Sequence, residues 1–312
     1  MALAHASGKV ILFGEHAVVY ARPAIAVPVI QVRAEAESGE GPKGQGILIV
    51  AEDLGRIHTI GRAPADEAIR PLEMTIVGTL EHLGLPQAQD LTVCIRSSIP
   101  VARGLGSGAA VSIAIVRSLA KHLGRLLEPE EISKLAYETE RIHHGTPSGI
   151  DNTVIAYEVP IYFVKGRSPE RFRVGKPLLI AIADTGVASP TKLAVEEVRR
   201  AWQGEPAKYE RLFDRIGLIA SRARKAMEEG ELRQIGSLMD ANQTLLEELG
   251  VSSPQLDSLV GAAREGGALG AKLSGAGKGG HMIALVTGET RKAVESALWG
   301  AGATNVILTE VR

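Results

Sequence analysis

Five features of this 312-residue chain combine residue types that could transfer a phosphoryl group to an alcohol. They are Lys9 followed by Glu15 and His16, the glycine-rich turn 104–108, Glu140, Asp151, and a second glycine-rich turn at 275–280. Backbone N–H groups of such turns could hold phosphates, a carboxylate with a hydroxyl could hold magnesium, and a lysine could offset developing negative charge. An aspartate is normally ionised at pH 7, so it could accept the proton of the alcohol.

The segment PVARGLGSGAA (100–110) follows a strand-like segment and precedes a helix-like one. Its glycines permit positive φ and close backbone approach, and the first N–H groups of the following helix have no partners within the helix. The helix expected over 109–123 is apolar on most sides, so its partial positive charge would lie in a less polar setting. A turn without a ligand would give the same local pattern. The motif lacks the Gly-Lys-Ser/Thr end of a Walker loop and the G-x-G-x-x-G dinucleotide spacing.

Two carboxylates follow in the next helical segment and its connection. Helical spacing from Pro129 places Glu140 beside the apolar stripe, where its carboxylate either reaches inward or is an ordinary boundary residue. The sequence HGTPSGIDN then breaks the helix and predicts Asp151 on a constrained loop. An Asx turn or a helix cap is the alternative explanation for an aspartate beside glycine.

Composition excludes several other functions. Because 35 basic and 36 acidic residues nearly cancel, no net positive charge attracts nucleic acid or an anionic membrane. Cys94 is the only cysteine, which rules out an intrachain disulfide and suits a reducing compartment. No signal-peptide pattern or membrane-length apolar run is present, so we expect a cytoplasmic protein. The histidines form no H-E-x-x-H pair and no G-x-S-x-G elbow occurs, which disfavours metallohydrolase and serine hydrolase chemistry.

Elements that could position these residues are spread over the whole chain. Alternation predicts strands at 30–37 and 91–96, with shorter strands at 9–13, 47–50, 160–164, 178–183, 282–286 and 305–311. A hairpin-like loop is expected at 38–46 and irregular chain at 56–66. Helical spacing covers 72–83, 109–123, 129–142, 191–202, 207–229, 232–249, 254–265 and 290–299. Strands and helices mix in both halves, and a charged segment at 165–176 marks an expected division into domains 1–172 and 173–312.

Four motifs together resemble the mevalonate kinase family of the GHMP small-molecule kinase superfamily. They are SGKVILFGEHAVVYARPAIA (7–26), PVARGLGSGAA (100–110), YETERIHHGTPSGIDN (137–152) and KLSGAGKGGHMIALV (272–286). Their order and spacing match over nearly the whole chain, and GEHAVVY followed by PAIA favours this branch over galactokinases. The resemblance implies a two-domain α+β GHMP kinase fold. Its N-terminal domain would be like the second domain of ribosomal protein S5, its C-terminal domain ferredoxin-like, and the site would lie in the cleft between them.

The resemblance also implies roles for individual residues. Asp151 matches the catalytic aspartate, which takes or steers the proton of the C5 hydroxyl of mevalonate, and Lys9 matches the lysine that stabilises charge. Glu140 matches a magnesium ligand, with Ser107 as a further metal candidate. Glu15, His16 and Thr191 match positions near the substrate. The ATP-binding positions are Pro100, Arg103, Gly104, Leu105, Gly106, Ser107, Gly108, Ala109, Gly275 and Gly277. Partners implied by the family are ATP with Mg²⁺, mevalonate and a second copy of the chain in a homodimer, with no nucleic acid and no membrane.

The chain departs from the family pattern at two motifs. GLGSGAA stands where GLGSSAA is usual, so the serine generally credited with magnesium is Gly108. Magnesium tolerates few protein ligands because it retains several waters. In the superfamily's third motif, which in this chain is the segment 272–286, Lys278 and His281 occupy positions that are usually glycine and a small residue or cysteine. The Lys278 side chain either adds a phosphate contact or points to solvent.

Three functions fit these observations. The first is ATP-dependent phosphorylation of the C5 hydroxyl of (R)-mevalonate. The second is phosphomevalonate kinase or another GHMP kinase of the same pathway, for which Lys278, Lys192 and Arg103 are candidate contacts to an acceptor phosphate. The retained pair of Lys9 and Asp151 disfavours the decarboxylase and 3-kinase branches. The third, suggested by Gly108, is a kinase-like sensor that binds nucleotide and metabolite without turnover.

Overall fold

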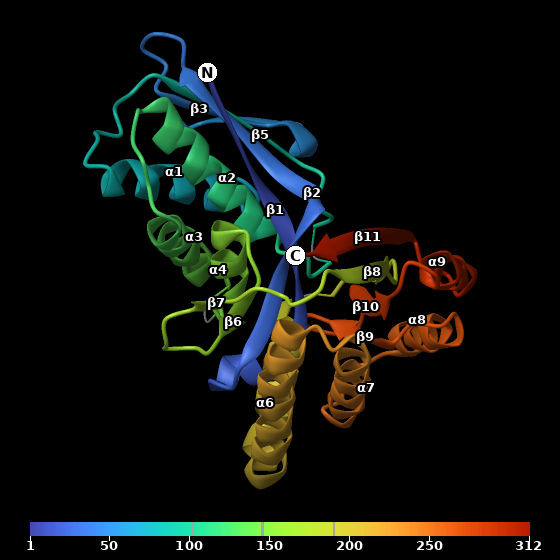
Figure 1. The fold of residues 1–312 in the computed structure, drawn as a ribbon. Helices are drawn as coiled ribbons and strands as arrows, with labels where there is room; N and C mark the ends of the chain where they lie inside the picture. The colour runs from blue at the N-terminus through green and yellow to red at the C-terminus, as the bar shows by residue number, and fades with distance from the viewer. Residues whose placement is uncertain (102, 145–146, 190) are drawn as a thin grey trace. The chain divides into compact units, whose positions relative to one another are not determined.

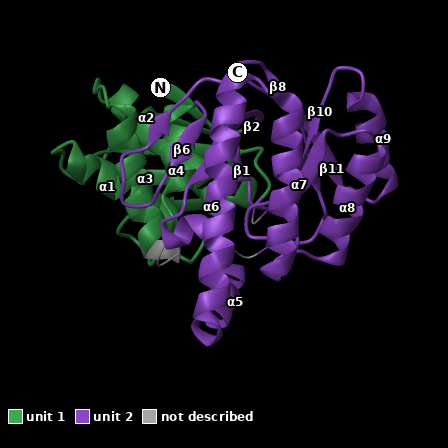
Figure 2. Cartoon of the chain, turned by 60° about the horizontal axis from the view of Figure 1, so that its bottom comes forward, with its two compact units in different colours: residues 1–8, 32–100, 106–158 green, residues 9–31, 101–105, 159–312 purple. Residues whose placement is uncertain are grey.

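The computed structural model describes residues 1–101, 103–144, 147–189 and 191–312. The chain forms two compact units that interleave along the sequence (Figures 1 and 2). Unit 1 comprises residues 1–8, 32–100 and 106–158, and unit 2 comprises residues 9–31, 101–105 and 159–312. Strands β1 (Ala2–Phe13) and β2 (Ala24–Glu40) each run from one unit into the other.

Unit 1 combines a mixed sheet with a group of helices. β5 (Leu91–Ser97) pairs antiparallel with the C-terminal part of β2 and parallel with β3 (Ile47–Ala51), which pairs with β4 (Arg56–Thr59). A short 3-10 helix, η2 (Glu52–Leu54), connects β3 to β4. Helices α1 (Arg70–His82), α2 (Ser107–His122), α3 (Pro129–His144) and α4 (Ile150–Tyr157) pack against one another.

Unit 2 contains an antiparallel sheet in the order β11-β8-β10-β9. Its strands are β8 (Leu178–Asp184), β9 (Gly270–Ser274), β10 (His281–Val286) and β11 (Asn305–Val311). Its helices are α5 (Thr191–Gly204), α6 (Pro206–Glu229), α7 (Leu232–Glu248), α8 (Pro254–Glu265) and α9 (Arg291–Gly300). The remaining elements are η1 (Ala17–Tyr20), a 3-10 helix, and the strands β6 (Ile161–Phe163) and β7 (Glu170–Arg171).

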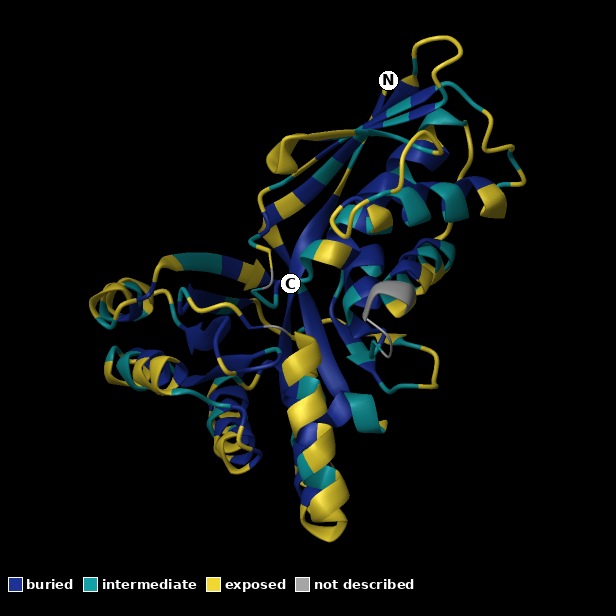
Figure 3. Cartoon of the chain, turned by 180° about the vertical axis from the view of Figure 1, so that it is seen from behind, coloured by how far each residue is buried: buried dark blue, intermediate teal, exposed yellow. Residues whose placement is uncertain are grey.

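The two strands that carry the third motif, β9 and β10, lie in the buried interior of unit 2. All described residues of β9 and β10 are buried, and the helices alternate between buried and exposed stretches (Figure 3). The edge strand β9 is covered by polar side chains of α7: Asp240 accepts from the N–H of Ala271 at 3.0 Å and Gln243 from that of Leu273 at 2.8 Å. These bonds satisfy backbone donors that an edge strand would otherwise leave open. β9 therefore provides a rigid base for the turn that follows it.

Several sequence-based expectations about local structure were wrong. Residues 38–46 do not form a hairpin, because the strand that follows them, β3, pairs in parallel with β5. β3 also pairs with β4, which lies within the segment 56–66 that was expected to be irregular. Asp151 lies in the first turn of helix α4 rather than on a loop. Gly149 at φ 89° is the residue that redirects the chain into this helix, a conformation that favours glycine. A helix of eight residues offers too few positions for its apolar spacing to be recognised.

Other boundaries agree closely with the sequence. Helix α8 and strand β11 have the predicted bounds, and Ser253 caps α8 by accepting from the N–H of Leu256. The predicted cap at Ser189-Pro190 involves Pro190, which lies outside the described residues. Among the described residues, no helix combines the length and the apolar character that crossing a membrane requires.

Candidate active site

Two glycine turns of unit 2 approach each other closely. Gly104 has φ 88° and Gly275 has φ 89°, conformations that side chains of other residues rarely allow. A Cβ placed on Gly275 would lie 3.9 Å from the Cα of Gly104, and a Cβ on Gly104 would lie 3.9 Å from the carbonyl oxygen of Ser274. Because neither turn carries a side chain at this point, their backbone groups can meet a ligand directly.

The first glycine turn is bonded to the strand that carries Lys9. The N–H of Lys9 donates to the carbonyl of Leu105 at 3.0 Å, and both residues are buried. Arg103, two residues earlier, donates from Nη1 to Oδ1 of Asp184 at 2.9 Å, at the end of β8. Lys9, Arg103, Gly104 and Leu105 of the predicted site are thus all in unit 2, and Lys9 is bonded through its backbone to the turn.

The segment 11–16 is tied to the third motif at three points. Ser274 accepts through Oγ from the N–H of Ile11 and donates to its carbonyl at 2.9 Å. The ring of His16 bonds through Nε2 to the carbonyl of Ala276 at 2.9 Å, and Glu15 pairs with Lys272. Residues more than 250 positions apart in sequence therefore form one rigid group within unit 2.

Glu15 and Lys272 form a fully buried ion pair. Both side chains have no exposed surface, and the ammonium of Lys272 also donates to the carbonyl of Leu273 at 2.6 Å. Burial raises the pKa of Glu15 and lowers the pKa of Lys272, while the pairing between them opposes both shifts. Oε2 of Glu15 accepts no hydrogen bond from the residues that the structure describes, so one carboxylate oxygen keeps its acceptor capacity.

His16 is held as a neutral ring. Burial lowers its pKa to about 4, and a carbonyl can only accept, so Nε2 carries the proton that is donated to Ala276. Nδ1 is consequently the acceptor of this ring. A substrate hydroxyl is a suitable donor to it.

In unit 1 the phosphate-loop candidates form the start of α2. Gly106, at φ 76°, is the N-cap, and Ser107, Gly108 and Ala109 make the first turn, whose N–H groups have no acceptors within the helix. Ala109 is buried, Ser107 is half-buried and Gly108 is exposed. Pro100, the first residue of the segment 100–110, is half-buried. The helix behind this turn is mostly buried, as its composition predicted.

Three hydroxyl groups join the helices that carry Ser107 and Glu140. Oγ1 of Thr75 bonds to Oγ of Ser112 at 3.2 Å and to Oγ1 of Thr139 at 3.1 Å, which joins α2 and α3 through α1. Ser112 lies five positions after Ser107, and Thr139 immediately precedes Glu140. Among the described residues no group of three His, Cys, Asp or Glu is close enough to hold a metal by itself. A carboxylate and a hydroxyl nevertheless fit magnesium, which prefers oxygen and keeps several waters.

Asp151 is fixed through its neighbour in α4. The amide of Asn152 donates to the carbonyl and to Oγ of Ser133 at 3.0 and 2.9 Å, and Thr153 bonds to the carbonyl of Gly149 at 2.7 Å. The bonds of Asn152 attach the first turn of α4 to α3, and Asp151 is half-buried at the N-terminal end of the helix.

The sequence and the fold both match known kinases over their full length. The family described as "GHMP kinases N terminal domain" matches residues 73–158, and "GHMP kinases C terminal" matches residues 223–302. Mevalonate kinase of Pyrococcus abyssi is 36% identical and the alignment covers 98% of this chain and 95% of that protein. This chain belongs to the mevalonate kinase family of GHMP kinases.

Solved structures agree with this family. The structure of L. major mevalonate kinase in complex with R-mevalonate matches with TM-score 0.84 and 29% identity, covering 100% of this chain and 96% of that one. Phosphomevalonate kinase of Streptococcus pneumoniae matches with TM-score 0.85 but only 16% identity over 99% of this chain and all of the other, which shows the fold alone. The two-domain α+β GHMP kinase fold is therefore confirmed. Fold similarity does not distinguish the two kinases, whereas sequence identity does.

Two charged residues of this family member were not identified from the sequence. Lys272 begins the third motif but has no role implied by the resemblance, and Asp184 ends a strand without any motif around it. A lysine inside an otherwise apolar strand was the available signal for Lys272, because a buried charge requires a partner. Thr191, predicted near the substrate, is the exposed first residue of α5 in unit 2.

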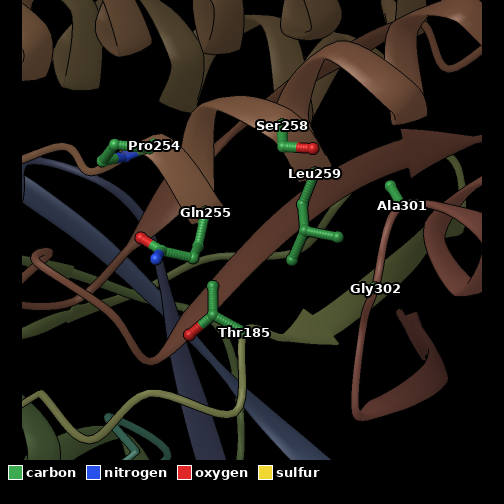
Figure 4. A pocket seen from close by; sticks show the side chains of 7 residues that line it. All are labelled: Thr185, Pro254, Gln255, Ser258, Leu259, Ala301 and Gly302. Carbon is green, nitrogen blue, oxygen red and sulfur yellow. The ribbon is translucent and has the colours of Figure 1, made fainter.

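Unit 2 also has a surface hollow of about 230 Å³ away from every predicted site residue. Figure 4 shows its lining, which consists of Thr185, Pro254, Gln255, Ser258, Leu259, Ala301 and Gly302. The lining contains neither an acid nor a base, so it offers no group for proton transfer.

Proposed function

We propose that this member of the mevalonate kinase family transfers the γ-phosphoryl group of ATP to the C5 hydroxyl of (R)-mevalonate, giving 5-phosphomevalonate and ADP. The observation that carries the proposal is the full-length sequence similarity to mevalonate kinases, within which the motifs carrying Lys9, Glu140 and Asp151 are all retained. We place the reaction in the cytoplasm, in isoprenoid precursor synthesis, and expect a homodimer. We also keep the expected division into domains 1–172 and 173–312.

Asp151 accepts the proton of the C5 hydroxyl as the hydroxyl oxygen bonds to the γ-phosphorus. The bond between that phosphorus and the bridging oxygen breaks, and ADP leaves with the electron pair. The ammonium of Lys9 stabilises the developing negative charge. His16 supports this assignment as a substrate contact, because its neutral ring presents an acceptor at Nδ1.

The nucleotide phosphates are held by backbone groups of residues 104–109 and by the turn at Gly275 and Gly277, with Pro100 and Arg103 at the loop's start. Glu140 and Ser107 would hold Mg²⁺, which neutralises phosphate charge when it is bound. Gly108 supplies no hydroxyl, so the remaining ligands are phosphate oxygens and water.

Phosphomevalonate is the competing acceptor. A phosphorylated acceptor needs cations to bind its phosphate. Nζ of Lys278 lies 4.0 Å from Oε2 of Glu197, so this carboxylate already offsets part of the lysine charge. Lys192 is exposed on α5. The pairing with Glu197 makes Lys278 a weaker candidate for contact with an acceptor phosphate.

The decisive experiment supplies Mg-ATP with mevalonate, phosphomevalonate, galactose or homoserine in separate reactions and follows ADP. Phosphorus NMR locates the new phosphate. We expect ADP formation with mevalonate and a phosphate on C5. ADP formation with phosphomevalonate alone would establish the competing kinase. Nucleotide binding without turnover on any acceptor would support a sensor instead.

A further inference from the structure

Arg103, Asp184 and His281 form a cluster that joins the first glycine turn of unit 2 to β8 and β10. His281 is 2% exposed, and its Nδ1 bonds to the carbonyl of Arg103. A carbonyl only accepts, so Nδ1 carries the proton. Asp184 is also buried and accepts through Oδ1 from Nη1 of Arg103 at 2.9 Å and from the N–H of Gly186 at 2.8 Å. The backbone and the guanidinium of Arg103 are therefore held by two different buried residues.

The surrounding backbone leaves little room for this arrangement to change. A Cβ placed on Gly280 would lie 3.0 Å from the carbonyl oxygen of Arg103, and the carbonyl of Gly280 accepts from both the N–H and Oγ1 of Thr185 at 2.9 Å. The N–H of Gly280 in turn donates to the carbonyl of Val187 at 2.8 Å. The turn that precedes His281 is thus fixed on both sides by the segment after Asp184.

His281 is neutral in this cluster. Burial lowers its pKa, as do the charges of Arg103 and Lys9, whereas the bond to the Arg103 carbonyl and the charge of Asp184 act in the opposite direction. Nε2 lies 3.9 Å from Oδ2 of Asp184, beyond hydrogen-bond distance. Asp184 therefore forms its side-chain hydrogen bond with the guanidinium of Arg103 rather than with the ring.

We propose that His281 and Asp184 are positioning residues that hold Arg103 as a contact to the nucleotide phosphates. Arg103 directly precedes Gly104, where the two glycine turns approach each other without side chains. A guanidinium has five N–H donors in a fixed plane, so a side chain held by one carboxylate still has donors for a phosphate oxygen. This inference rests on the proposed kinase function and adds to it the two buried residues that position Arg103.

The test measures binding of the ATP analogue AMPPNP with magnesium by calorimetry, without any acceptor. Arg103→Ala should weaken affinity about tenfold to a hundredfold, as expected for a charge-assisted hydrogen bond to phosphate. Asp184→Asn should weaken it about threefold to tenfold, and should have no further effect in a protein that already carries Arg103→Ala. Additive effects in the double variant would show that Asp184 does not act through Arg103 and would overturn the proposal. Arg96→Ala, which removes a surface ion pair with Glu35 in unit 1, is the matched control and should bind as the wild type does.

His281 is tested with two variants of different donor capacity. His281→Phe keeps a ring but removes the donor, and should weaken AMPPNP binding about threefold to tenfold. His281→Asn retains an N–H that reaches the same carbonyl and should restore most of the affinity. Equal losses in both variants would contradict a role for the bond to Arg103. In turnover assays the KM for ATP should rise while the KM for mevalonate stays constant, whereas general loosening of the protein would raise both.

Failure of this inference can be told apart from failure of the proposed function. Wild-type protein that phosphorylates mevalonate while the Arg103 and His281 variants bind AMPPNP normally would overturn only the inference. Wild-type protein that binds AMPPNP and responds to the variants as expected, but phosphorylates no acceptor, would overturn only the proposed function. Absence of nucleotide binding by the wild type would overturn both.

Discussion

Lys272 neutralises the carboxylate of Glu15, a residue 257 positions earlier in the chain, at a point where neither side chain touches solvent. The pair connects β9, which carries the start of the third motif, to the segment that also contains His16. Two charges removed from water are stable only together, because each compensates the desolvation of the other. Glu15 therefore contributes to the structure of unit 2 in addition to its predicted place near the substrate.

Replacing one member of this pair should lower the free energy of unfolding much more than replacing both. We expect Lys272→Met to lower the free energy of unfolding by about 3–5 kcal/mol, since it leaves a buried carboxylate without a partner. The double variant Glu15→Gln with Lys272→Met should recover a large part of that loss. Urea unfolding monitored by circular dichroism measures both values. A double variant no more stable than Lys272→Met would show that the pairing is not what stabilises this region.

The sequence predicted long elements and contiguous motifs better than it predicted contacts. Helix α8 was predicted with its observed bounds because apolar periodicity, a serine cap and a first-turn proline all agree there. Strand β11 also has its predicted bounds. Strand β4 and helix α4 were missed, since four and eight residues give too little periodicity. The pairing of Lys272 with Glu15, and that of Asp184 with Arg103, depend on tertiary structure, which no local pattern encodes.

The neutral state of His16 makes stability depend on pH. Its pKa is about 4 in the folded protein against 6.5 when exposed, so the unfolded chain binds more protons between these values. The stabilisation is complete above pH 6.5 and is lost as the pH falls through 4, by up to about 3 kcal/mol. His16→Gln keeps a donor for the Ala276 carbonyl but does not titrate. Urea unfolding at pH 7.5 and pH 4.5 should show a smaller acid loss for His16→Gln than for the wild type, and equal losses would contradict the shifted pKa.

Asp151→Asn should separate chemistry from binding. The amide is nearly the same size but cannot take the proton of the C5 hydroxyl, so we expect kcat to fall by about a hundredfold to ten-thousandfold. Affinity for AMPPNP should change little. Steady-state kinetics and calorimetry on the same preparation give the two values. Asp53→Asn, on the exposed connection between β3 and β4, is the control and should retain full turnover. Equal loss of binding and turnover in Asp151→Asn would contradict its role as proton acceptor.

Gly108→Ser tests whether the missing hydroxyl of the phosphate loop limits magnesium use. Gly108 lies in the first turn of α2, is exposed, and a Cβ added there meets no atom within 4 Å, so a side chain fits without strain. Gly108→Ala adds the same Cβ without an oxygen and is the matched control. If a second hydroxyl joins Ser107 and Glu140 around the metal, Gly108→Ser should lower the magnesium concentration for half-maximal turnover about threefold to tenfold, whereas Gly108→Ala should leave it unchanged. Identical magnesium titrations for both variants and the wild type would show that water and phosphate oxygens already complete the coordination of the ion.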